Sequence, residues 1–393
     1  MPRRIIRYRR RARKFSLFRF TLVVTVFAAG LIVGAQVVRN LFILVGKATI
    51  ASNKTSAIAP GQKSPNTTSP GRAFISTSPE IFQLIYNVTT PPHLTESQDL
   101  QNIVDRVVKL AAEKKFSTDP LSVTLIDINR NEIASYQQNK KRYPASVIKI
   151  FWMVVFYAQV DKGIIANKIN FDSYVQAMIK KSSNDASSVL LDYLTGTRTW
   201  SKSQLPDKEF KQWLDRRKTI NTFFQRAGYQ EININQKTFP IPYLKIDSPE
   251  GTDLRMRGNN PEKPIRNQVT TYHAARLLYE MAKGEAVSQQ ASQEMLQLLT
   301  RDVRKEVWKA QPQNSIEFNP VESFFGESLP SNTRLMSKAG WFSGARNEAA
   351  FIQTEDGKVA YILVVFADDK LYAEDRDIFP EISRLVYKQM TIR

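Results

Sequence analysis

A serine and a lysine three residues apart open an otherwise apolar run, and this pair has the chemistry of a nucleophile and its base. Ser146 and Lys149 lie in "YPASVIKIFWMVV" (143–155) and form the only Ser-x-x-Lys pair in the chain. On a helix this spacing puts both side chains on one face. A serine hydroxyl becomes reactive when a neighbour takes its proton, and lysine does so only when neutral. Lowering a lysine pKa from about 10.4 to near 7 requires roughly 4–5 kcal/mol, which burial beside a second positive charge such as Lys338 supplies.

The helix that carries this pair is predicted to be buried. "SVIKIFWMVVFYAQV" (146–160) is hydrophobic on all sides, as expected for a central helix. Two polar groups in its first turn would therefore face a cleft, where the positive end of the helix dipole favours an oxyanion on Ser146. The structural alternative is an N-cap serine followed by a lysine that extends to solvent.

Two further motifs favour the catalytic interpretation. Ser182-Ser183-Asn184 lies between two helical patterns, and Lys338-Ala339-Gly340, the only Lys-x-Gly in the chain, begins a predicted strand. The Ser-x-Asn motif alone is weak evidence for a catalytic site, because it also occurs at residues 64–66. The order Ser-x-x-Lys, Ser-x-Asn, Lys-x-Gly is the signature of penicillin-recognising serine enzymes.

On these motifs the chain resembles the class A β-lactamase-like family over about Thr95 to Arg393. "VTLIDINRNEIASYQQNKKRYPASVIK" is similar to that family's first hairpin and nucleophile helix, and "TTYHAARLLYEMAKGE" to its helix after the omega loop. The resemblance implies that Ser146 is acylated, Lys149 accepts its proton and Ser182 relays a proton to the leaving nitrogen. It also implies an oxyanion hole formed by the backbone amides of Ser146 and Trp341.

The resemblance further implies a set of substrate-binding residues. Asn184 would hold the amide side chain of the substrate, and Lys338 with Arg346 would attract its carboxylate. The predicted substrate-binding residues are Asn184, Lys338, Ala339, Gly340, Trp341 and Arg346. Because the family usually has a hydroxyl residue at the position of Ala339, one hydrogen bond to the substrate carboxylate is missing, at a cost of about 1 kcal/mol.

The sequence departs from the family at the residue that activates water for deacylation. Class A enzymes have an omega-loop glutamate, but counting back from Thr270 places Arg255 there, and counting forward from Gly228 places Thr238 there. The loop is therefore enlarged. Folding could bring five carboxylates to the site: Glu231, Asp247, Glu250, Asp253 and Glu262. Of these, Asp253 and Glu262 are the candidate deacylation bases. The alternative is that each of the five lies on the solvated surface of the protein.

Composition excludes several other mechanisms. The chain has two histidines, His93 and His273, and no cysteine, so a zinc site rich in His and Cys ligands is not expected. A Ser-His-Asp triad has no support, and both histidines are predicted to be structural. We expect no metal and no cofactor.

The formal charge of +19 is concentrated at the N-terminus. Residues 1–79 hold 14 Lys/Arg and no Asp/Glu, and the rest of the chain is close to neutral. Basic residues followed by an apolar span fit the positive-inside rule better than phosphate recognition, so no nucleic acid partner is expected.

Residues 20–38 form a span of 19 uncharged residues, long enough to cross a bilayer as a helix. A cleaved signal peptide, with the small-residue pattern Val33-Gly34-Ala35, is the alternative.

The resulting organisation is a basic cytoplasmic tail (1–19), a transmembrane anchor (20–38), a Ser/Thr/Pro-rich tether (39–93) and a β-lactamase-like catalytic domain (94–393). For the domain we predict an α+β fold of the β-lactamase/transpeptidase type. An antiparallel sheet built from both terminal segments is flanked by helices, with an inserted all-helical subdomain over about 146–301. A helix from about Thr95, with Gln98 reaching back, should precede hairpins at Asn129–Asn131 and Asp356-Gly357, and a helix over 373–390 should close the domain.

The expected protein is a monomeric, single-pass protein of the bacterial cytoplasmic membrane with its domain in the periplasm or outside the cell. The expected activity is β-lactam ring opening through an acyl-enzyme. Two alternatives stay open: a D-alanyl-D-alanine carboxypeptidase or other peptidoglycan peptidase, and a non-hydrolysing β-lactam or peptidoglycan binding or sensor module.

Overall fold

The computed structural model describes residues 83–200, 205–310 and 318–393. The predicted tail and anchor, and the tether up to residue 82, lie outside these residues. Within the described ranges, no helix combines the length and apolar character needed to cross a bilayer. The folded domain starts earlier than residue 94: Tyr86 is fully buried, and its amide donates to the Phe223 carbonyl at 3.2 Å.

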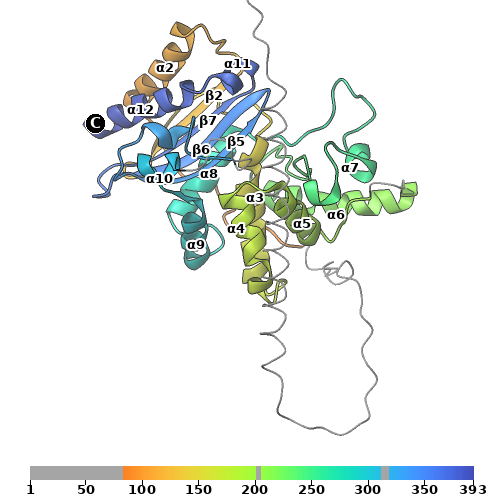
Figure 1. Cartoon of the computed structure of the whole chain (residues 1–393). Coiled ribbons are helices and arrows are strands. Elements are labelled where there is room, and N and C mark those ends of the chain that lie inside the picture. The colour runs from red at the N-terminus through yellow and green to blue at the C-terminus, as the bar shows by residue number, and fades with distance from the viewer. Residues whose placement is uncertain (1–82, 201–204, 311–317) are drawn as a thin grey trace, which may run out of the picture. The chain divides into compact units, whose positions relative to one another are not determined.

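The strands of the described residues form one seven-stranded sheet in the order β1-β3-β2-β7-β6-β5-β4 (Figure 1). The strands are β1 (Thr95–Glu96), β2 (Leu121–Asp127), β3 (Glu132–Tyr136), β4 (Thr300–Arg301), β5 (Arg334–Phe342), β6 (Ala345–Gln353) and β7 (Ala360–Ala367). Every pairing is antiparallel except β1 with β3, so the sheet is mixed rather than purely antiparallel. The two terminal segments meet in the centre, where β2 pairs with β7.

Both predicted hairpins are present. β2 and β3 flank the turn at 129–131, and β6 and β7 flank the turn at 356–357. All seven residues of β2 are buried. Helices cover both faces of the sheet, and a doubly covered strand has no solvent-facing side.

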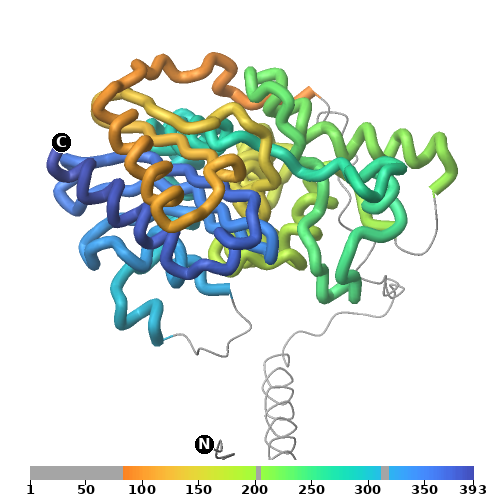
Figure 2. The backbone as a smooth tube through the Cα atoms, turned by 90° about the horizontal axis from the view of Figure 1, so that it is seen from above, coloured from red at the N-terminus to blue at the C-terminus, as the bar shows by residue number. Residues whose placement is uncertain are grey.

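One face of the sheet is covered by α2 (Gln98–Glu113) and α12 (Ile378–Ile392), which lie side by side in both views (Figures 1 and 2). The first helix is capped by Ser97 instead of Thr95, which belongs to β1. The predicted closing helix is two helices, α11 (Lys370–Glu374) and α12, because the Asp375 carboxylate accepts from the amides of Asp377 and Ile378 between them.

The other face carries the helical part of the domain. Its helices are α3 (Lys149–Asp161), α4 (Asp172–Lys180), α5 (Asn184–Thr195), α6 (Asp207–Gln225), α7 (Gly251–Arg255), α8 (Thr271–Ala282) and α9 (Gln289–Leu299), and α10 (Lys305–Lys309) follows β4. Short 3-10 turns are η2 (Ala145–Ile148), η3 (Lys168–Phe171), η4 (Pro242–Leu244) and η5 (Phe325–Ser328). The predicted helical insertion is therefore present, between β3 and β5.

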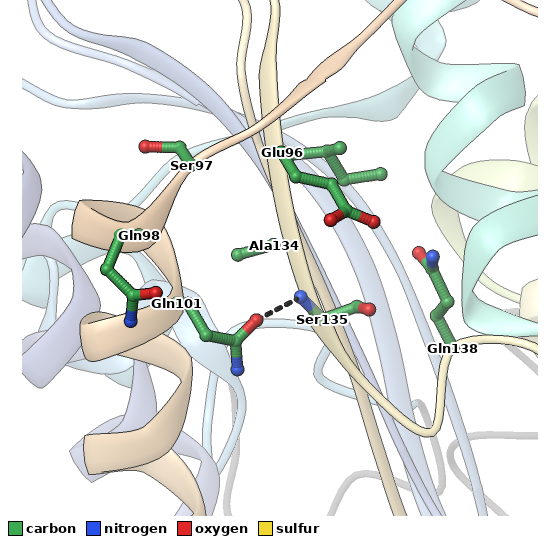
Figure 3. Close-up of a pocket in the computed structure, with 8 residues that line it drawn as sticks. Glu96, Ser97, Gln98, Gln101, Ala134, Ser135 and Gln138 are labelled. Carbon is green, nitrogen blue, oxygen red and sulfur yellow. Dashed lines mark hydrogen bonds between the residues drawn. The ribbon is translucent and has the colours of Figure 1, made fainter.

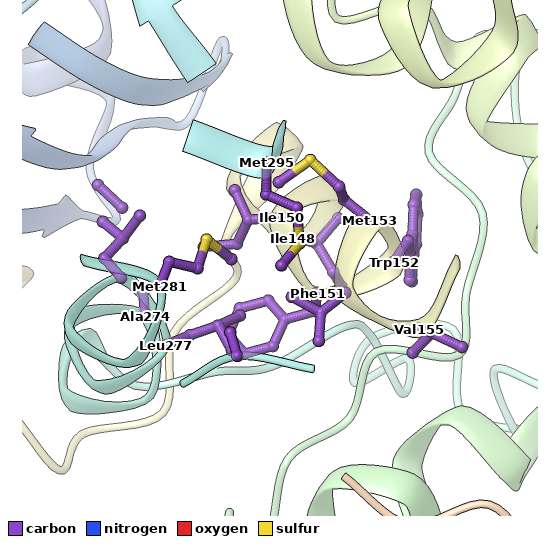
Figure 4. Close-up of a cluster of buried hydrophobic side chains, with 14 of the residues drawn as sticks. Ile148, Ile150, Phe151, Trp152, Met153, Val155, Ala274, Leu277, Met281 and Met295 are labelled. Atoms are coloured by element: carbon purple, nitrogen blue, oxygen red, sulfur yellow. The ribbon is translucent and has the colours of Figure 1, made fainter. Parts of the chain in front are cut away.

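Helix α3 is the centre of this part. Its residues from Lys149 to Gln159 are all buried, as its uniformly apolar sequence predicts. Figure 4 shows Ile150, Phe151 and Met153 of α3 among side chains of α8 and α9, including Leu277 and Met295. A helix packed on all sides is a rigid base, so the residues at its first turn are held firmly.

Candidate active site

Ser146 lies in η2, the single 3-10 turn that leads directly into α3. The turn starts at Ala145, which has a positive φ of 46°, a conformation that costs a non-glycine residue about 1–2 kcal/mol and needs support. Support comes from the sheet: the Asn347 side-chain amide donates to the Tyr143 carbonyl at 2.9 Å, and the Tyr143 amide donates to the Asp368 carboxylate at 3.3 Å. Ser146 is half-buried, and its hydroxyl hydrogen-bonds no other described residue.

The backbone of strand β5 is in close contact with this turn at Gly340. A Cβ at position 340 would lie 2.8 Å from both the Pro144 carbonyl oxygen and the Ser146 amide nitrogen. Only glycine allows the two backbones to come this close. The close approach brings the main chain of β5, just before Trp341, next to the amide of Ser146, where the sequence predicts the oxyanion hole.

Lys149, the first residue of α3, is fully buried, and in the described part of the chain its amine bonds only uncharged oxygens. Its Nζ donates to the Ser182 carbonyl at 2.5 Å and to Asn184 Oδ1 at 2.8 Å, with the Ser182 hydroxyl at 3.4 Å. Burial lowers the pKa of Lys149 from 10.5 to about 7. The value agrees with what the chemistry of a lysine base requires, although burial alone accounts for it.

Ser182 lies between two lysines. It adopts a positive φ of 56° just before α5, and its hydroxyl accepts from Lys338 Nζ at 2.9 Å. Lys338 is also buried and donates to the Ala339 carbonyl at 2.8 Å. Burial first, and then the positive charges of Lys149 and Arg301, lower the pKa of Lys338 well below its usual value. The three segments that the sequence singled out thus meet at one point, although Lys338 lies in the middle of β5 rather than at its start.

The model of the beta-lactamase enzyme family matches residues 99–172 and 165–390, which is most of the chain. The chain belongs to the beta-lactamase enzyme family. No curated protein sequence matched it.

Solved structures show the same fold. The beta-lactamase of Sphaerobacter thermophilus DSM 20745 is similar at 18% identity and a TM-score of 0.50, over 74% of this chain and 98% of that one. A point mutant of PBP-A, solved as an acyl-enzyme complex with penicillin G, is similar at 14% identity and a TM-score of 0.50, over 77% of this chain and all (100%) of that one. The β-lactamase/transpeptidase-like α+β fold expected from the sequence is therefore confirmed.

In this beta-lactamase family member, Arg346 does not reach the cluster. Arg346 pairs with Trp341 across the β5–β6 ladder, whereas Lys338 pairs with Ala349, so Arg346 and Lys338 point to opposite faces of the sheet. The Arg346 guanidinium is buried and donates to the carbonyls of Ser323, Tyr372 and Ala373. The structure gives it a role in holding the sheet to α11, in place of the carboxylate-binding role inferred from the resemblance.

Ala339 and Trp341 likewise turn their side chains away. Ala339 is fully buried in the core on the α2/α12 face, and the Trp341 indole donates to the Ala373 carbonyl at 2.8 Å. Ala339 is therefore available to a substrate through its main chain only, whereas the Trp341 side chain is 49% exposed and hydrogen-bonded to α11.

The two candidate deacylation bases also lie elsewhere. Asp253 is buried in α7, where its carboxylate accepts from Thr199 at 3.1 Å and faces Arg217 at 3.7 Å. Glu262 is exposed in the loop that follows. Neither carboxylate contacts Lys149, Ser182 or Lys338, so the structure does not bring a water-activating acid to the cluster from either position.

Sequence reasoning missed the residues that hold the cluster in place, Asn347 and Arg301. Arg301 is 8% exposed and donates to the carbonyls of Ser337 and Ile179, both at 2.9 Å, which joins β5 to the end of α4 just before Ser182. Three consecutive polar residues, Arg346-Asn347-Glu348, at the start of a strand that continues as "AAFI" were the available signal for Asn347. Nothing in the local sequence distinguishes Arg301 from a surface arginine.

The remaining predictions concern metals and histidines. Among the described residues, no group of three or more His, Cys, Asp or Glu side chains is arranged to hold a metal ion. His273 caps α8 by accepting from the Thr270 amide, and burial lowers its pKa to about 4.

A separate pocket of about 380 Å³, lined by Glu96, Gln101, Ser135 and Gln138 among others, lies between α2 and β3 (Figure 3). It includes none of the predicted site residues.

Proposed function

We propose that this protein is a class A-like serine acyl-enzyme hydrolase that opens β-lactam rings through Ser146, with Lys149 as the base. The observation that carries the proposal is the buried Lys149 amine with its pKa of about 7, one turn from Ser146 and bonded to Ser182 and Asn184. At neutral pH a large fraction of this amine is neutral and able to take a proton. Membership of the beta-lactamase enzyme family supports the assignment.

The reaction follows from these positions. Lys149 takes the proton of the Ser146 hydroxyl as Oγ bonds to the carbonyl carbon of the substrate, and the carbonyl oxygen becomes an oxyanion near the amides of Ser146 and Trp341. The oxyanion then collapses, the carbon–nitrogen bond breaks, and the Ser182 hydroxyl gives its proton to the leaving nitrogen. Lys149, whose Nζ lies 3.4 Å from the Ser182 hydroxyl, returns to Ser182 the proton that it took from Ser146 and is neutral again. An ester on Ser146 results.

Acylation should depend on pH in a way that reports on Lys149. Because only the neutral amine accepts a proton, we expect the acylation rate to fall about tenfold per pH unit below pH 7 and to level off above it. Stopped-flow acylation between pH 5 and 9, with circular dichroism as a check on folding, measures this profile. A rate that stays constant from pH 5 to 8 would exclude Lys149 as the titrating base.

Deacylation is the step that the structure supports least. Among the described residues no carboxylate forms a hydrogen bond or ion pair with the Lys149–Ser182–Lys338 cluster: the buried Glu348 acts on Lys338 only electrostatically, and Asp253 is held by Arg217 and Thr199. This observation favours a second candidate function, a β-lactam or peptidoglycan binding or sensor module whose acyl-enzyme persists. The PBP-A mutant, named as an acyl-enzyme complex with penicillin G, is a protein of the same fold that holds such an adduct.

A D-alanyl-D-alanine carboxypeptidase uses the same three motifs and is a further candidate. Its acyl-enzyme forms when the terminal D-alanine leaves, and the positive charge of Arg301, whose pKa of about 10 keeps it protonated at neutral pH, suits the carboxylate of that leaving group. Release of D-alanine from a stem peptide without penicillin turnover would favour the peptidase.

The deciding experiment is a pre-steady-state trace with a chromogenic cephalosporin. We expect a burst equal to the enzyme concentration, followed by a slow steady state. A linear trace of many turnovers without a burst would mean that deacylation is not slow, and that a water-activating group has been overlooked. A flat trace, with no burst and no turnover, would contradict the proposed function.

For location we propose a monomer anchored to the bacterial cytoplasmic membrane by residues 20–38, with the domain in the periplasm or outside the cell. The uncharged span and the basic residues before it support this proposal. Fractionation of cells that express the full chain tests it: recovery in the soluble fraction without detergent would contradict an anchor.

A further inference from the structure

The cavity between α2 and β3 exists because β1 is short. Thr95 and Glu96, the two residues of β1, pair with β3, and the chain then turns into α2. One step further along β3, the Ser135 amide donates to Gln101 Oε1 of α2 at 3.3 Å instead of to a strand (Figure 3). Side chains rather than backbone therefore cover this edge of β3. The space that stays open, about 380 Å³, is within the size range of small-molecule sites.

The cavity carries one unpaired negative charge. Among the lining residues that the structure describes, Glu96 alone is charged; the others are serines, glutamines and two apolar residues. The exposed Glu96 side chain forms no hydrogen bond or ion pair with another described residue. Arg393 reaches the cavity wall, where it donates to the Ser97 hydroxyl at 3.2 Å. It is already paired with the carboxylates of Asp127 and Glu132, so Glu96 has no counter-ion there.

Gln138 adds an acceptor that lacks a donor. Its main-chain carbonyl accepts from the Tyr272 amide at 3.3 Å, which fixes the residue against α8. Its side-chain Oε1 is shielded from solvent and has no hydrogen-bond partner in the described part of the chain. A buried acceptor is unfavourable until a donor reaches it. Figure 3 shows the Gln138 amide and the Glu96 carboxylate turned toward one another, and rotation of the amide presents Oε1 to a donor in the cavity.

These groups match the chemistry of a primary ammonium. An ammonium has three N–H donors and no acceptor, and Glu96, Gln138 and Ser135 supply oxygen acceptors around the cavity. Ile133 and Ala134 add apolar lining for a short alkyl chain. A single carboxylate is too few for a calcium site, which needs six to eight oxygen ligands. An anion would meet the charge of Glu96 directly.

We propose that this cavity is a binding site for a primary alkylammonium group, as at the end of a lysine side chain, with Glu96 as its anionic partner and Gln138 as a second acceptor. The site goes beyond the proposed hydrolase function and does not depend on acylation of Ser146. None of the catalytic cluster residues lines it. Because no described carboxylate hydrogen-bonds that cluster, an ammonium finds no equivalent partner there.

The test is a ligand-observed NMR titration of the full chain with Nα-acetyl-lysine amide and with its Nε-acetylated form, which keeps the chain but removes the charge. We expect the wild type to bind the charged compound about tenfold more tightly or better, because hydrogen bonds between charged groups are the stronger ones. A third probe, 1-aminopentane, distinguishes the source of the ligand. Binding as tight as that of the lysine compound identifies a free alkylamine as sufficient, and weaker binding identifies a peptide side chain.

Three variants locate the site. Glu96→Gln should weaken binding of the charged compound about tenfold, and Gln138→Leu should weaken it about threefold, with no change for the acetylated compound. Glu113→Gln is the matched control, because it removes the same charge at the far end of α2, where the side chain is 63% exposed. It should bind the charged compound as the wild type does.

Equal binding of the charged and the acetylated compound by the wild type would overturn the proposal, and so would the absence of any binding. Equal affinities of Glu96→Gln and Glu113→Gln would overturn it as well. Ser146→Ala separates this site from the catalytic one, because it leaves the cavity intact and should bind the amine as tightly as the wild type. Loss of amine binding in Ser146→Ala would overturn the proposal, whereas amine binding without penicillin labelling would count against the proposed function alone.

Discussion

Replacing Lys149 with arginine is expected to slow acylation of Ser146 by about 10³-fold, within the usual range for loss of a general base. Arginine keeps the positive charge but stays protonated at every pH at which the protein is folded. The variant therefore separates the need for a neutral amine from the need for a charge. The measurement is the second-order rate of labelling by a fluorescent penicillin.

Lys162→Arg is the matched control, because it makes the same change at the exposed C-terminal end of the same helix. It should label at the wild-type rate. Labelling of Lys149→Arg within tenfold of wild type would show that Lys149 acts through its charge rather than as a base.

Lys149→Met adds a stability readout to this prediction. A pKa lowered from 10.5 to about 7 means that the fold disfavours the protonated amine, by about 4–5 kcal/mol where the amine is protonated in both the folded and the unfolded chain. The cost is complete below pH 7 and fades as pH rises toward 10.5. Methionine removes this cost but leaves the Ser182 and Asn184 oxygens without their donor, which costs about 1–3 kcal/mol for each buried group.

The free energy of unfolding of Lys149→Met minus that of wild type, both measured in urea, should therefore be larger at pH 6 than at pH 10. The variant is then relatively more stable at pH 6. A difference that does not change with pH would contradict the lowered pKa of Lys149.

Gly340→Ala is expected to reduce acylation about 100-fold or more, because the added methyl meets backbone rather than side chains. The new Cβ would lie 2.8 Å from the Pro144 oxygen and the Ser146 nitrogen, and 3.0 Å from the Val147 nitrogen. Strand β5 must then move away from η2, which separates Lys338 and the Trp341 amide from Ser146. Loss of one oxyanion-hole donor alone costs about 10²–10³ in rate, and the overpacking adds about 1–3 kcal/mol of instability.

Gly326→Ala controls for the loss of stability. Its Cβ would meet Leu335 and Val321 side chains at 2.9 and 3.0 Å in the core on the other face of the sheet. It should destabilise the fold while a folded sample acylates at close to the wild-type rate. If Gly340→Ala and Gly326→Ala lowered the rate equally, the close approach of β5 to Ser146 would have no specific role in the reaction.

Much of the fold and the core of the site could be predicted from the sequence, because both depend on local signals. The apolar character of α3 on all sides predicted its burial, and the turns at Asn131 and Gly357, both with positive φ, predicted the two hairpins. Ser146, Lys149, Ser182 and Lys338 were identified by their motifs, and their catalytic roles stay predictions. The structure adds that Ser182 lies within reach of both lysines.

The failures arise where the outcome depends on long-range packing. Arg346 points to the face of the sheet opposite Lys338, and this depends on the register of β6 with β5 rather than on any local signal. Asp253 was a candidate base from the sequence, but Arg217 of α6 and Thr199 bind it. Arg301 was overlooked because its importance comes from carbonyls 36 and 122 residues away in the chain.

The most direct test of the central claim is to locate the covalent adduct. The wild-type protein, incubated with a fluorescent penicillin, digested and analysed by tandem mass spectrometry, should carry one label on the peptide that contains Ser146, and Ser146→Ala should carry none. An unlabelled wild type, or a Ser146→Ala variant labelled to the same extent, would contradict the account.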